Sequence, residues 1–427
     1  MELNQIHELY LSCSEVSTDT RNISKGAMFF ALKGPNFDGN EYALHALDIG
    51  AKFAVVDSVL NPPNDQFVQV EDVLKTLQDL ATFHREYLGL PIVALTGSNG
   101  KTTTKEIINN ILQQRFKTIA TNGNLNNHIG VPLTLLRMNT DTEIGIVEMG
   151  ANHAKEIELL CHIARPNVGY ITNFGKAHLE GFGSEHGVVL AKSELYDYLK
   201  SNDGLIVLNL DDPIQEKQVG CYTNIFSFSE SKQASINISL LESQPFLHIA
   251  AADLIIKSHL VGRYNFHNIA AAMAIGSYFK LFTQQLKVGV EAYVPSNNRS
   301  QIIKQNSNEI LLDAYNANPS SMKVAMENFK GLENLNKLAI LGDMFELGGM
   351  SSAEHLELVN QAVSTKCCMF YFVGSHFFKQ KRVQSNVQFF EEFEDLKLYL
   401  CETNISNTSI LIKGSRGMAL ERILELI

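Results

Sequence analysis

The sequence is poor in the features that mark secreted and membrane-spanning proteins. Its six cysteines are scattered through 427 residues and form no Cys-x-x-Cys pair, so neither a disulfide framework nor a zinc site is expected. No apolar segment is long enough to cross a bilayer, and the first residues lack the basic and apolar parts of a signal peptide. A cytoplasmic location without membrane insertion is therefore expected.

Clustered positive charge is also missing. The 46 acidic residues outnumber the 35 basic ones, which gives a net charge of −11. A nucleic-acid partner is therefore not expected, because phosphate backbones are met by clustered Lys and Arg. A single nucleotide needs only a local positive site. The length exceeds what one hydrophobic core supports, so two or three domains are expected.

Alternating apolar and amphipathic segments predict an α/β fold in three parts. Residues 1–88 mix short strands with turns and end in a helix, before a linker at Gly89-Leu90-Pro91. Residues 89–296 have the strand–helix pattern of a doubly wound domain, which binds ligands at the carboxyl ends of its strands. Residues 297–427 repeat the alternation on a smaller scale. The predicted buried strands are Ile92–Thr96, Ile144–Met149, Val168–Asn173, Leu205–Asn209, Leu338–Leu341, Phe370–Val373 and Ile410–Lys413.

The first of these strands runs into the most informative motif, Gly97-Ser98-Asn99-Gly100-Lys101-Thr102-Thr103. Glycine allows the backbone to bend sharply and approach phosphate oxygens, and a helix start directs N–H groups at an anion. Lys101 would neutralise the β- and γ-phosphates, and the Thr102 hydroxyl would hold Mg²⁺. The loop is shorter than the standard motif, which has glycine where this chain has Leu95. The alternative is a plain helix N-cap beside a chance lysine.

Three further residues lie where strands end or helices begin in this central part. Glu148 ends a buried strand, where a carboxylate would face a nucleotide-bound Mg²⁺; alternatively, it is an exposed acid near a helix start. His178 follows the third strand and is either a metal or phosphate contact or a structural histidine. Lys192 lies on an apolar helix stripe, which lowers an amine's pKa. A neutral amine can react with CO₂ to form a carbamate that binds Mg²⁺. Otherwise the lysine extends its ammonium into water.

The last third of the chain offers weaker signals. Arg299 could reach a transferring phosphoryl group, and Asp313 could accept from a ribose hydroxyl, although a surface ion pair explains both. The amide-rich run 121–130 could bind a polar ligand or be a plain turn. Three predicted strands end in glycine and a polar residue, at Gly342-Asp343, Gly374-Ser375 and Gly414-Ser415-Arg416. They indicate a second binding rim or ordinary strand-to-helix turns.

Taken in order, these motifs resemble the Mur ligase family over nearly the whole chain. The phosphate loop is similar to the family's Gly-Thr-Asn-Gly-Lys-Thr, with Ser98 replacing Thr, and Gly262–Ala270 resembles its adenine element, with Tyr264 replacing the usual His. The residues near Asp19, Glu148, His178, Lys192 and Arg299 match further family motifs. Within the family, three segments resemble the branch that adds D-alanyl-D-alanine: Tyr315-Asn316-Ala317-Asn318-Pro319, 341–348 and Lys413-Gly414-Ser415-Arg416.

The resemblance implies an ATP-dependent ligase of peptidoglycan precursor synthesis that joins UDP-N-acetylmuramoyl-tripeptide to D-Ala-D-Ala through an acyl phosphate. Residues 1–88 would bind the UDP substrate, 89–296 ATP, and 297–427, a Rossmann-like domain, would serve the second substrate. A monomer is expected. The implied catalytic residues are Lys101, His178, Lys192 and Arg299. The implied ligands of two Mg²⁺ ions are Thr102, Glu148, His178 and carbamylated Lys192.

The resemblance also implies two sets of binding residues. The ATP-binding residues would be Gly97, Ser98, Asn99, Gly100, Lys101, Thr102, Thr103, Asn268, Arg299 and Asp313. The substrate-binding residues would be Asp19, Arg21, Asn126, Asn127, Asn316, Asn318, Ser415 and Arg416. Another Mur-type or folylpolyglutamate-type amide ligase is the near alternative. A nucleotide-controlled binding module and a phosphotransferase are more distant ones.

Overall fold

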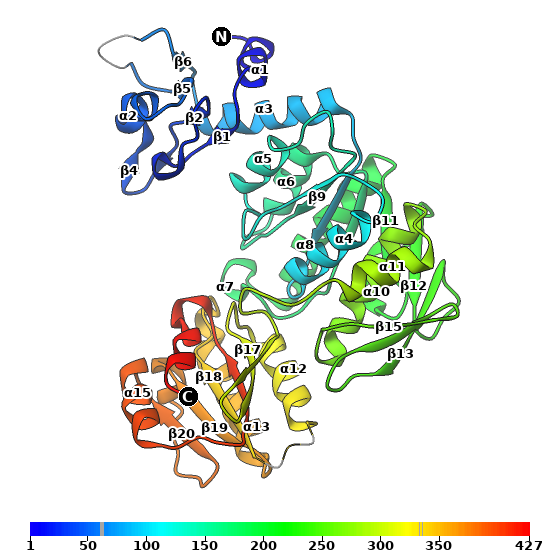
Figure 1. The fold of residues 1–427 in the computed structure, drawn as a ribbon, viewed down its shortest axis with the longest axis vertical. Helices are drawn as coiled ribbons and strands as arrows, with labels where there is room; N and C mark the ends of the chain where they lie inside the picture. The colour runs from blue at the N-terminus through cyan, green and yellow to red at the C-terminus, as the bar shows by residue number, and fades with distance from the viewer. Residues whose placement is uncertain (60–63, 333, 335) are drawn as a thin grey trace.

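The computed structural model describes residues 1–59, 64–332, 334 and 336–427. These residues form three successive α/β lobes, with the two chain ends in opposite outer lobes (Figure 1). Each lobe is built on its own mainly parallel sheet. The α/β fold class predicted from the sequence is therefore confirmed.

The N-terminal lobe is a small parallel sheet with helices around it. Its strand order is β1 (Val16–Ser17), β2 (Met28–Phe30), β5 (Phe53–Val56) and β6 (Phe67–Gln69). The helices are α1 (Leu3–Leu11), α2 (Ala43–Asp48) and α3 (Val73–Leu88), and β3 (Lys33–Gly34) pairs with β4 (Phe37–Asp38).

Helix α3 belongs to two lobes at once. It closes the N-terminal lobe and packs on α5 and α6 of the middle lobe (Figure 1). The Thr82 hydroxyl donates to the Ile163 carbonyl at 3.1 Å, and Arg85 Nε donates to the Ala164 carbonyl at 3.2 Å. These carbonyls end α6, where a helix lacks internal donors and a cation is favoured. The first two lobes are thus joined by a helix rather than by a loose linker.

The middle lobe carries the largest sheet. Its strands, in spatial order, are β15 (Leu254–Lys257), β14 (His248–Ala251), β13 (Ile236–Glu242), β12 (Ile225–Ser229), β11 (Leu205–Asn209), β10 (Val168–Ile171), β7 (Ile92–Thr96), β9 (Ile144–Glu148) and β8 (Thr118–Ala120). Its helices are α4 (Lys101–Leu112), α5 (Gly130–Leu135), α6 (Glu156–Ala164), α7 (Leu179–Phe182), α8 (Glu185–Ser201), α9 (Pro213–Val219), α10 (Phe266–Tyr278) and α11 (Thr283–Glu291).

Two predicted strands of this sheet end earlier than expected. The strand expected to reach Asn173 ends at Ile171, because Thr172 and Asn173 bind the phosphate loop: the Thr172 hydroxyl donates to the Asn99 carbonyl at 2.6 Å. The strand expected to reach Met149 ends at Glu148. Thr172 and Asn173, which follow β10, therefore hold the phosphate loop.

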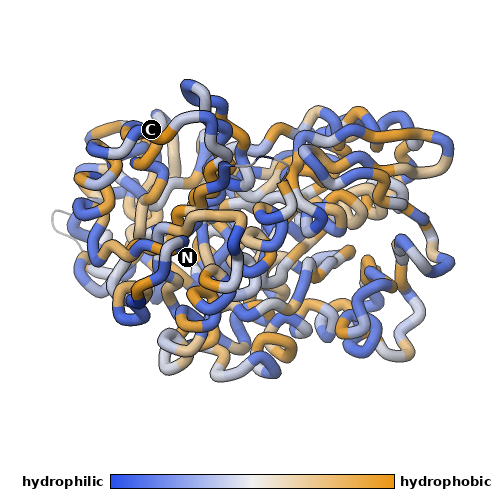
Figure 2. The backbone as a smooth tube through the Cα atoms, turned by 90° about the horizontal axis from the view of Figure 1, so that it is seen from below, coloured by the Kyte–Doolittle hydropathy of each residue, from blue (hydrophilic) through white to orange (hydrophobic). Residues whose placement is uncertain are grey.

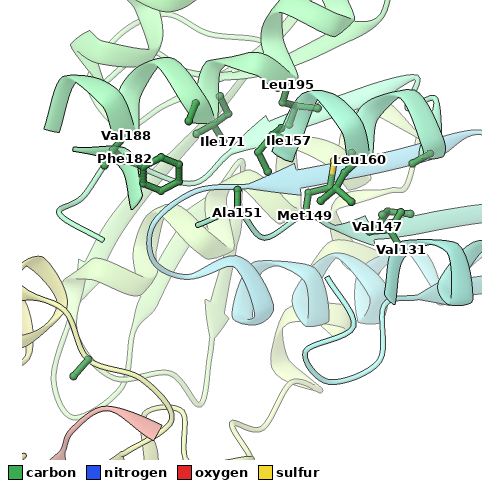
Figure 3. Packing of buried hydrophobic residues seen from close by; sticks show 14 of the residues in the cluster. Val131, Val147, Met149, Ala151, Ile157, Leu160, Ile171, Phe182, Val188 and Leu195 are labelled. Carbon is green, nitrogen blue, oxygen red and sulfur yellow. The ribbon is translucent and has the colours of Figure 1, made fainter. Parts of the chain in front are cut away.

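Apolar side chains fill both faces of the middle sheet. Figure 3 shows one face, where Val147 lies beside Val131 of α5, and Ile171 lies near Ile157 of α6 and Leu195 of α8. These side chains are at most 1% exposed, as expected for a parallel sheet covered on both faces. This packing fixes the strand ends from which the site residues project.

The C-terminal lobe has the order β16 (Gln301–Gln305), β17 (Asn308–Asp313), β21 (Ser409–Lys413), β18 (Lys337–Gly342), β19 (Met369–Val373) and β20 (Val387–Phe390). Only the β16–β17 pair is antiparallel among the described strands of this sheet. The helices are α12 (Pro319–Lys330), α13 (Ser351–Ser364), α14 (Ser375–Phe378) and α15 (Phe393–Glu402).

Hydrophobic stretches are short and interrupted by hydrophilic residues along the backbone (Figure 2). Among the described residues, no helix has the length and apolarity that crossing a membrane requires.

Candidate active site

The phosphate-loop sequence adopts a tight bend between β7 and α4. Gly97 has φ 138° and Gly100 has φ 80°, backbone conformations that glycine adopts without steric cost. A Cβ on Gly97 would lie 2.0 Å from Thr172 Oγ1. The loop is held by Asn173, whose carbonyl accepts from the Ser98 N–H at 3.0 Å. The bend thus depends on close packing against the end of β10 as well as on glycine.

Lys101 folds back over this loop. Its Nζ donates to the Gly97 carbonyl at 2.6 Å. Withdrawal from water lowers the pKa of Lys101, Glu148 opposes this shift, and Arg299 adds to it. The ammonium is thus held beside the loop's backbone, where an anion seated in the bend would meet it.

The loop opens onto a cleft of about 890 Å³ between the middle and C-terminal lobes. Most residues predicted for the site line this cleft, although they come from distant parts of the chain. They are Ser98, Asn99, Gly100, Lys101, Thr102, Thr103, Asn126, Asn127, Glu148, His178, Asn268, Arg299, Asp313, Asn316 and Asn318.

Glu148 is a buried carboxylate with one uncommitted oxygen. The residue is 1% exposed, and its Oε1 accepts from Asn126 Nδ2 at 2.8 Å. Its Oε2 has no hydrogen-bond partner among the described residues. A buried polar atom without a partner is costly, and hard cations bind such oxygens. The donor set of Glu148 and the Thr102 hydroxyl, in one cleft beside the phosphate loop, therefore fits Mg²⁺. The interpretation of Glu148 as an exposed acid is wrong.

His178 makes a contact that the sequence did not indicate. It precedes α7 with φ 51°, and its Nδ1 lies 2.5 Å from Glu346 Oε2 in the C-terminal lobe. The adjacent His178 ring lowers the pKa of Glu346. Glu346 lies in the 341–348 motif, and a carboxylate in that motif is the one signal that could have identified it.

Lys192 is buried in α8, as the apolar stripe predicted. The residue is 0% exposed, its Nζ donates to the Ala151 carbonyl at 3.2 Å, and it lies 5.0 Å from the centre of the Phe182 ring. Burial, and secondarily Lys101, lowers the pKa of Lys192 to about 7, against smaller opposing effects of Glu156 and Glu194. The alternative of an ammonium extended into water is therefore wrong.

Not every predicted residue reaches the cleft. Neither Lys192 nor Gly97 is among the described residues that line it, although Gly97 shapes the loop. Asp19 and Arg21 pair with each other at 2.6 Å on the surface of the N-terminal lobe. The Ser415 hydroxyl accepts from the Phe345 N–H at 3.0 Å, and Arg416 pairs with Glu421 at 3.2 Å.

Asp343 does not belong to a second binding rim. Its two carboxylate oxygens accept from the N–H groups of His376 and Phe377, each at 2.9 Å, and thus cap α14. The alternative interpretation, strand-to-helix turn chemistry, accounts for this strand end.

Arg299 and Asp313 do not form the surface ion pair considered from the sequence. The Arg299 guanidinium lies 3.5 Å from the centre of the Tyr315 ring, which is a cation–π contact. Asp313 Oδ2 instead pairs with Lys413 Nζ at 2.5 Å. Lys413 ends β21 and is buried, so its place at a strand end was the signal for this partner.

A nucleoside triphosphate seated in this cleft would touch two lobes at once, which is the arrangement of multidomain P-loop enzymes. Family models match three consecutive segments of the chain: the Mur ligase family catalytic domain over residues 12–85, the Mur ligase middle domain over 95–276, and the Mur ligase glutamate ligase domain over 298–416. The chain belongs to the Mur ligase family.

Individual relatives cover nearly the full length. The UDP-N-acetylmuramoyl-tripeptide–D-alanyl-D-alanine ligase of Bacillus subtilis is 34% identical, over 96% of this chain and 92% of its own. The structure of MurF from Acinetobacter baumannii has a TM-score of 0.87 at 27% identity and covers 99% of this chain and 97% of its own. MurF ligase from Thermotoga maritima in complex with ADP has a TM-score of 0.84 at 28% identity, over 98% of this chain and 97% of its own.

Proposed function

We propose that this chain is an ATP-dependent ligase that joins UDP-N-acetylmuramoyl-tripeptide to D-Ala-D-Ala. The observation that carries the proposal is the cleft, where Lys101 and Thr102 of the phosphate loop meet Glu148 and the Arg299 of another lobe. The name of the Bacillus subtilis relative supports the choice of substrates, and the ADP complex of the Thermotoga maritima relative supports that of the nucleotide.

The reaction requires two anions to meet. The carboxylate of the tripeptide attacks the γ-phosphorus of ATP, ADP leaves, and an acyl phosphate forms. The amine of D-Ala-D-Ala then attacks the acyl carbon, and phosphate leaves. Lys101 and Arg299 would offset the charge that gathers in the first step, and removing one such group typically costs about 10²–10³ in rate.

Thr102 and Glu148 are the residues that would hold Mg²⁺ at the β- and γ-phosphates. When bound, the ion would offset phosphate charge and orient the γ-phosphoryl group. A second ion at His178 and a carbamate on Lys192 are the finer part of the proposal. The depressed pKa of Lys192, about 7, supports the carbamate, because the amine that attacks CO₂ must be neutral.

The remaining assignments are part of the same proposal. Residues 1–88 would bind the uridine nucleotide, with Asp19 and Arg21 on their exposed surface. Residues 89–296 would bind ATP, and 297–427 would serve D-Ala-D-Ala through Asn316. The cytoplasmic location and the monomeric state stay predictions.

Phosphate release tests the proposal directly. The purified chain is given ATP, Mg²⁺ and one of a panel of UDP-muramoyl peptides, with D-Ala-D-Ala, with single amino acids or with neither. We expect release only with the tripeptide and D-Ala-D-Ala, and at least a hundredfold less with Lys101→Ala. Preference for a single amino acid would point to another amide ligase of the family. Phosphate retained on an isolable product would point to a phosphotransferase.

A further inference from the structure

One hydrogen bond ties the phosphate loop directly to the C-terminal lobe. Asn318 Nδ2 donates to Asn99 Oδ1 at 2.7 Å, across a separation of 219 residues in the chain. Asn99 is part of the loop bend, and Asn318 immediately precedes α12. The bond therefore joins the two halves of the cleft at the place where phosphates would be bound.

The Asn318 side chain has a second task at the same time. Its Oδ1 accepts from the Ser321 N–H at 2.9 Å and so caps α12. The Asn318 N–H donates to the Ser321 hydroxyl at 3.1 Å, and the residue is 7% exposed. Both ends of the amide are thus committed within the protein, which disfavours the role of a substrate ligand predicted from the sequence.

A neighbouring contact strengthens this junction. The Ser320 hydroxyl accepts from the Lys176 N–H at 2.7 Å, and the Ser98 hydroxyl donates to the Gly175 carbonyl at 2.7 Å. A Cβ on Gly175 would lie 2.9 Å from Asn99 Nδ2 and 3.0 Å from Ser320 Oγ. The phosphate loop, the segment after β10 and the start of α12 therefore meet without room for a side chain at Gly175.

We propose that Asn318 is a positioning residue that sets the register of the C-terminal lobe on the phosphate loop. Arg299 and Asp313 are carried by the same lobe as Asn318, whereas Lys101 and Thr102 follow Asn99. Groups from the two lobes can act on one phosphoryl group only when their separation is fixed, and a displacement of about 1 Å can cost up to about a hundredfold in rate. The catalytic part of this inference rests on the proposed ligase function.

The test variant is Asn318→Ser. Serine caps a helix as well as asparagine does, but its short side chain cannot reach Asn99. The matched control is Glu354→Gln, which weakens the 2.9 Å ion pair with Lys176 at the same interface without touching the phosphate loop. Asn99→Ala removes the bond from its other end and leaves the cap of α12 intact, so that the test does not depend on one substitution.

Native exposed cysteines supply a readout that does not depend on activity. Cys221 lies in the middle lobe and Cys401 in the C-terminal lobe. The other accessible thiols are removed by Cys13→Ser and Cys367→Ser. Spin labels attached to Cys221 and Cys401 then report the distance between the two lobes by pulsed electron paramagnetic resonance. Steady-state kinetics with the tripeptide substrate and D-Ala-D-Ala supply kcat and KM for the same proteins.

We expect Asn318→Ser and Asn99→Ala to broaden or shift the label distance, and Asn318→Ser to lower kcat ten- to a hundredfold with KM values within about twofold. Glu354→Gln should leave kcat within about twofold. An unchanged distance and kcat in Asn318→Ser would overturn the inference, as would a raised KM for D-Ala-D-Ala at unchanged kcat and distance, which identifies a substrate ligand. If the unsubstituted protein has no ligase activity but Asn318→Ser still changes the label distance, the positioning role of Asn318 is supported and the proposed function is refuted.

Discussion

At the scale of single residues, the site is marked by ionisable groups that the fold keeps out of water. Glu148 has a buried oxygen without a partner among the described residues, and Lys192 is buried with a pKa near 7. Such arrangements cost stability and concentrate where chemistry requires them. Lys105 is equally buried, but its Nζ pairs with Glu106 at 2.7 Å and so has a structural explanation. Lys105 thus has a carboxylate partner, whereas Lys192 has none among the described residues.

Replacement of Lys192 tests the carbamate. If Lys192 carries the proposed carbamate, Lys192→Ala is expected to lose about 10²–10³ in rate, and added acetate should restore part of it by occupying the vacated space. Lys192→Met fills that space and should not respond to acetate. A carbamate signal with ¹³C-bicarbonate, measured by NMR in the parent and absent from both variants, provides the direct check. Full activity in Lys192→Ala would reject the role.

At the scale of elements, the site is assembled from strand ends and the glycine conformations that follow them. Gly100 has φ 80°, and a Cβ there would lie 2.5 Å from Asn268 Oδ1. Gly89, which follows α3, has a similar φ of 64°, but no atom of the described residues lies within 4 Å of such a Cβ. The two glycines thus share a backbone requirement and differ in their surroundings.

This pair separates backbone strain from steric contact. Gly100→Ala and Gly89→Ala should each lose about 1–2 kcal/mol of stability through the left-handed backbone. Only Gly100→Ala should also displace Asn268 and weaken ADP binding, by at least about tenfold. Urea unfolding and calorimetric titration with ADP measure the two effects. Equal ADP affinities in both variants would show that contact with Asn268 does not shape the loop.

Elements with strong local signals could be predicted from the sequence, and long-range pairs could not. The β7–loop–α4 unit was predicted because a buried apolar run, two glycines and Lys101 are adjacent in the chain. Strand β13 was not predicted, because Ile236, Ile238 and Leu240 alternate with exposed residues along it, whereas the predicted strands are near-continuous apolar runs. The His178–Glu346 and Asn99–Asn318 contacts join residues more than a hundred positions apart, and no local pattern encodes which polar groups a lobe interface brings together.

At the scale of the whole molecule, polar contacts accompany the apolar packing between lobes. One such polar contact, the histidine joint, connects α1 and α3 to the middle lobe. In it His7 Nε2 is 3.0 Å from His84 Nδ1. His84 Nε2 lies 2.9 Å from the Met138 carbonyl. A carbonyl can only accept, so His84 carries its proton on Nε2 and its Nδ1 accepts from His7. Both rings are almost fully buried, at 4% and 2% exposure.

Acid should therefore loosen this joint. Burial lowers the pKa of both histidines below their usual 6.5. Below pH 6.5 the unfolded chain therefore binds protons that the folded chain does not bind. Above pH 6.5 the neutral pair makes its full contribution to the free energy of unfolding. Below pH 6.5 this contribution falls by up to about 1.4 kcal/mol for each bound proton and each pH unit. His84→Gln, which keeps a donor for Met138 and an acceptor for His7, should flatten the loss between pH 7.5 and 5.5 in urea unfolding. The control is His186→Gln, at an exposed position of α8, which should keep the parent's slope; a parent slope unchanged by His84→Gln would exclude the joint as the acid-sensitive element.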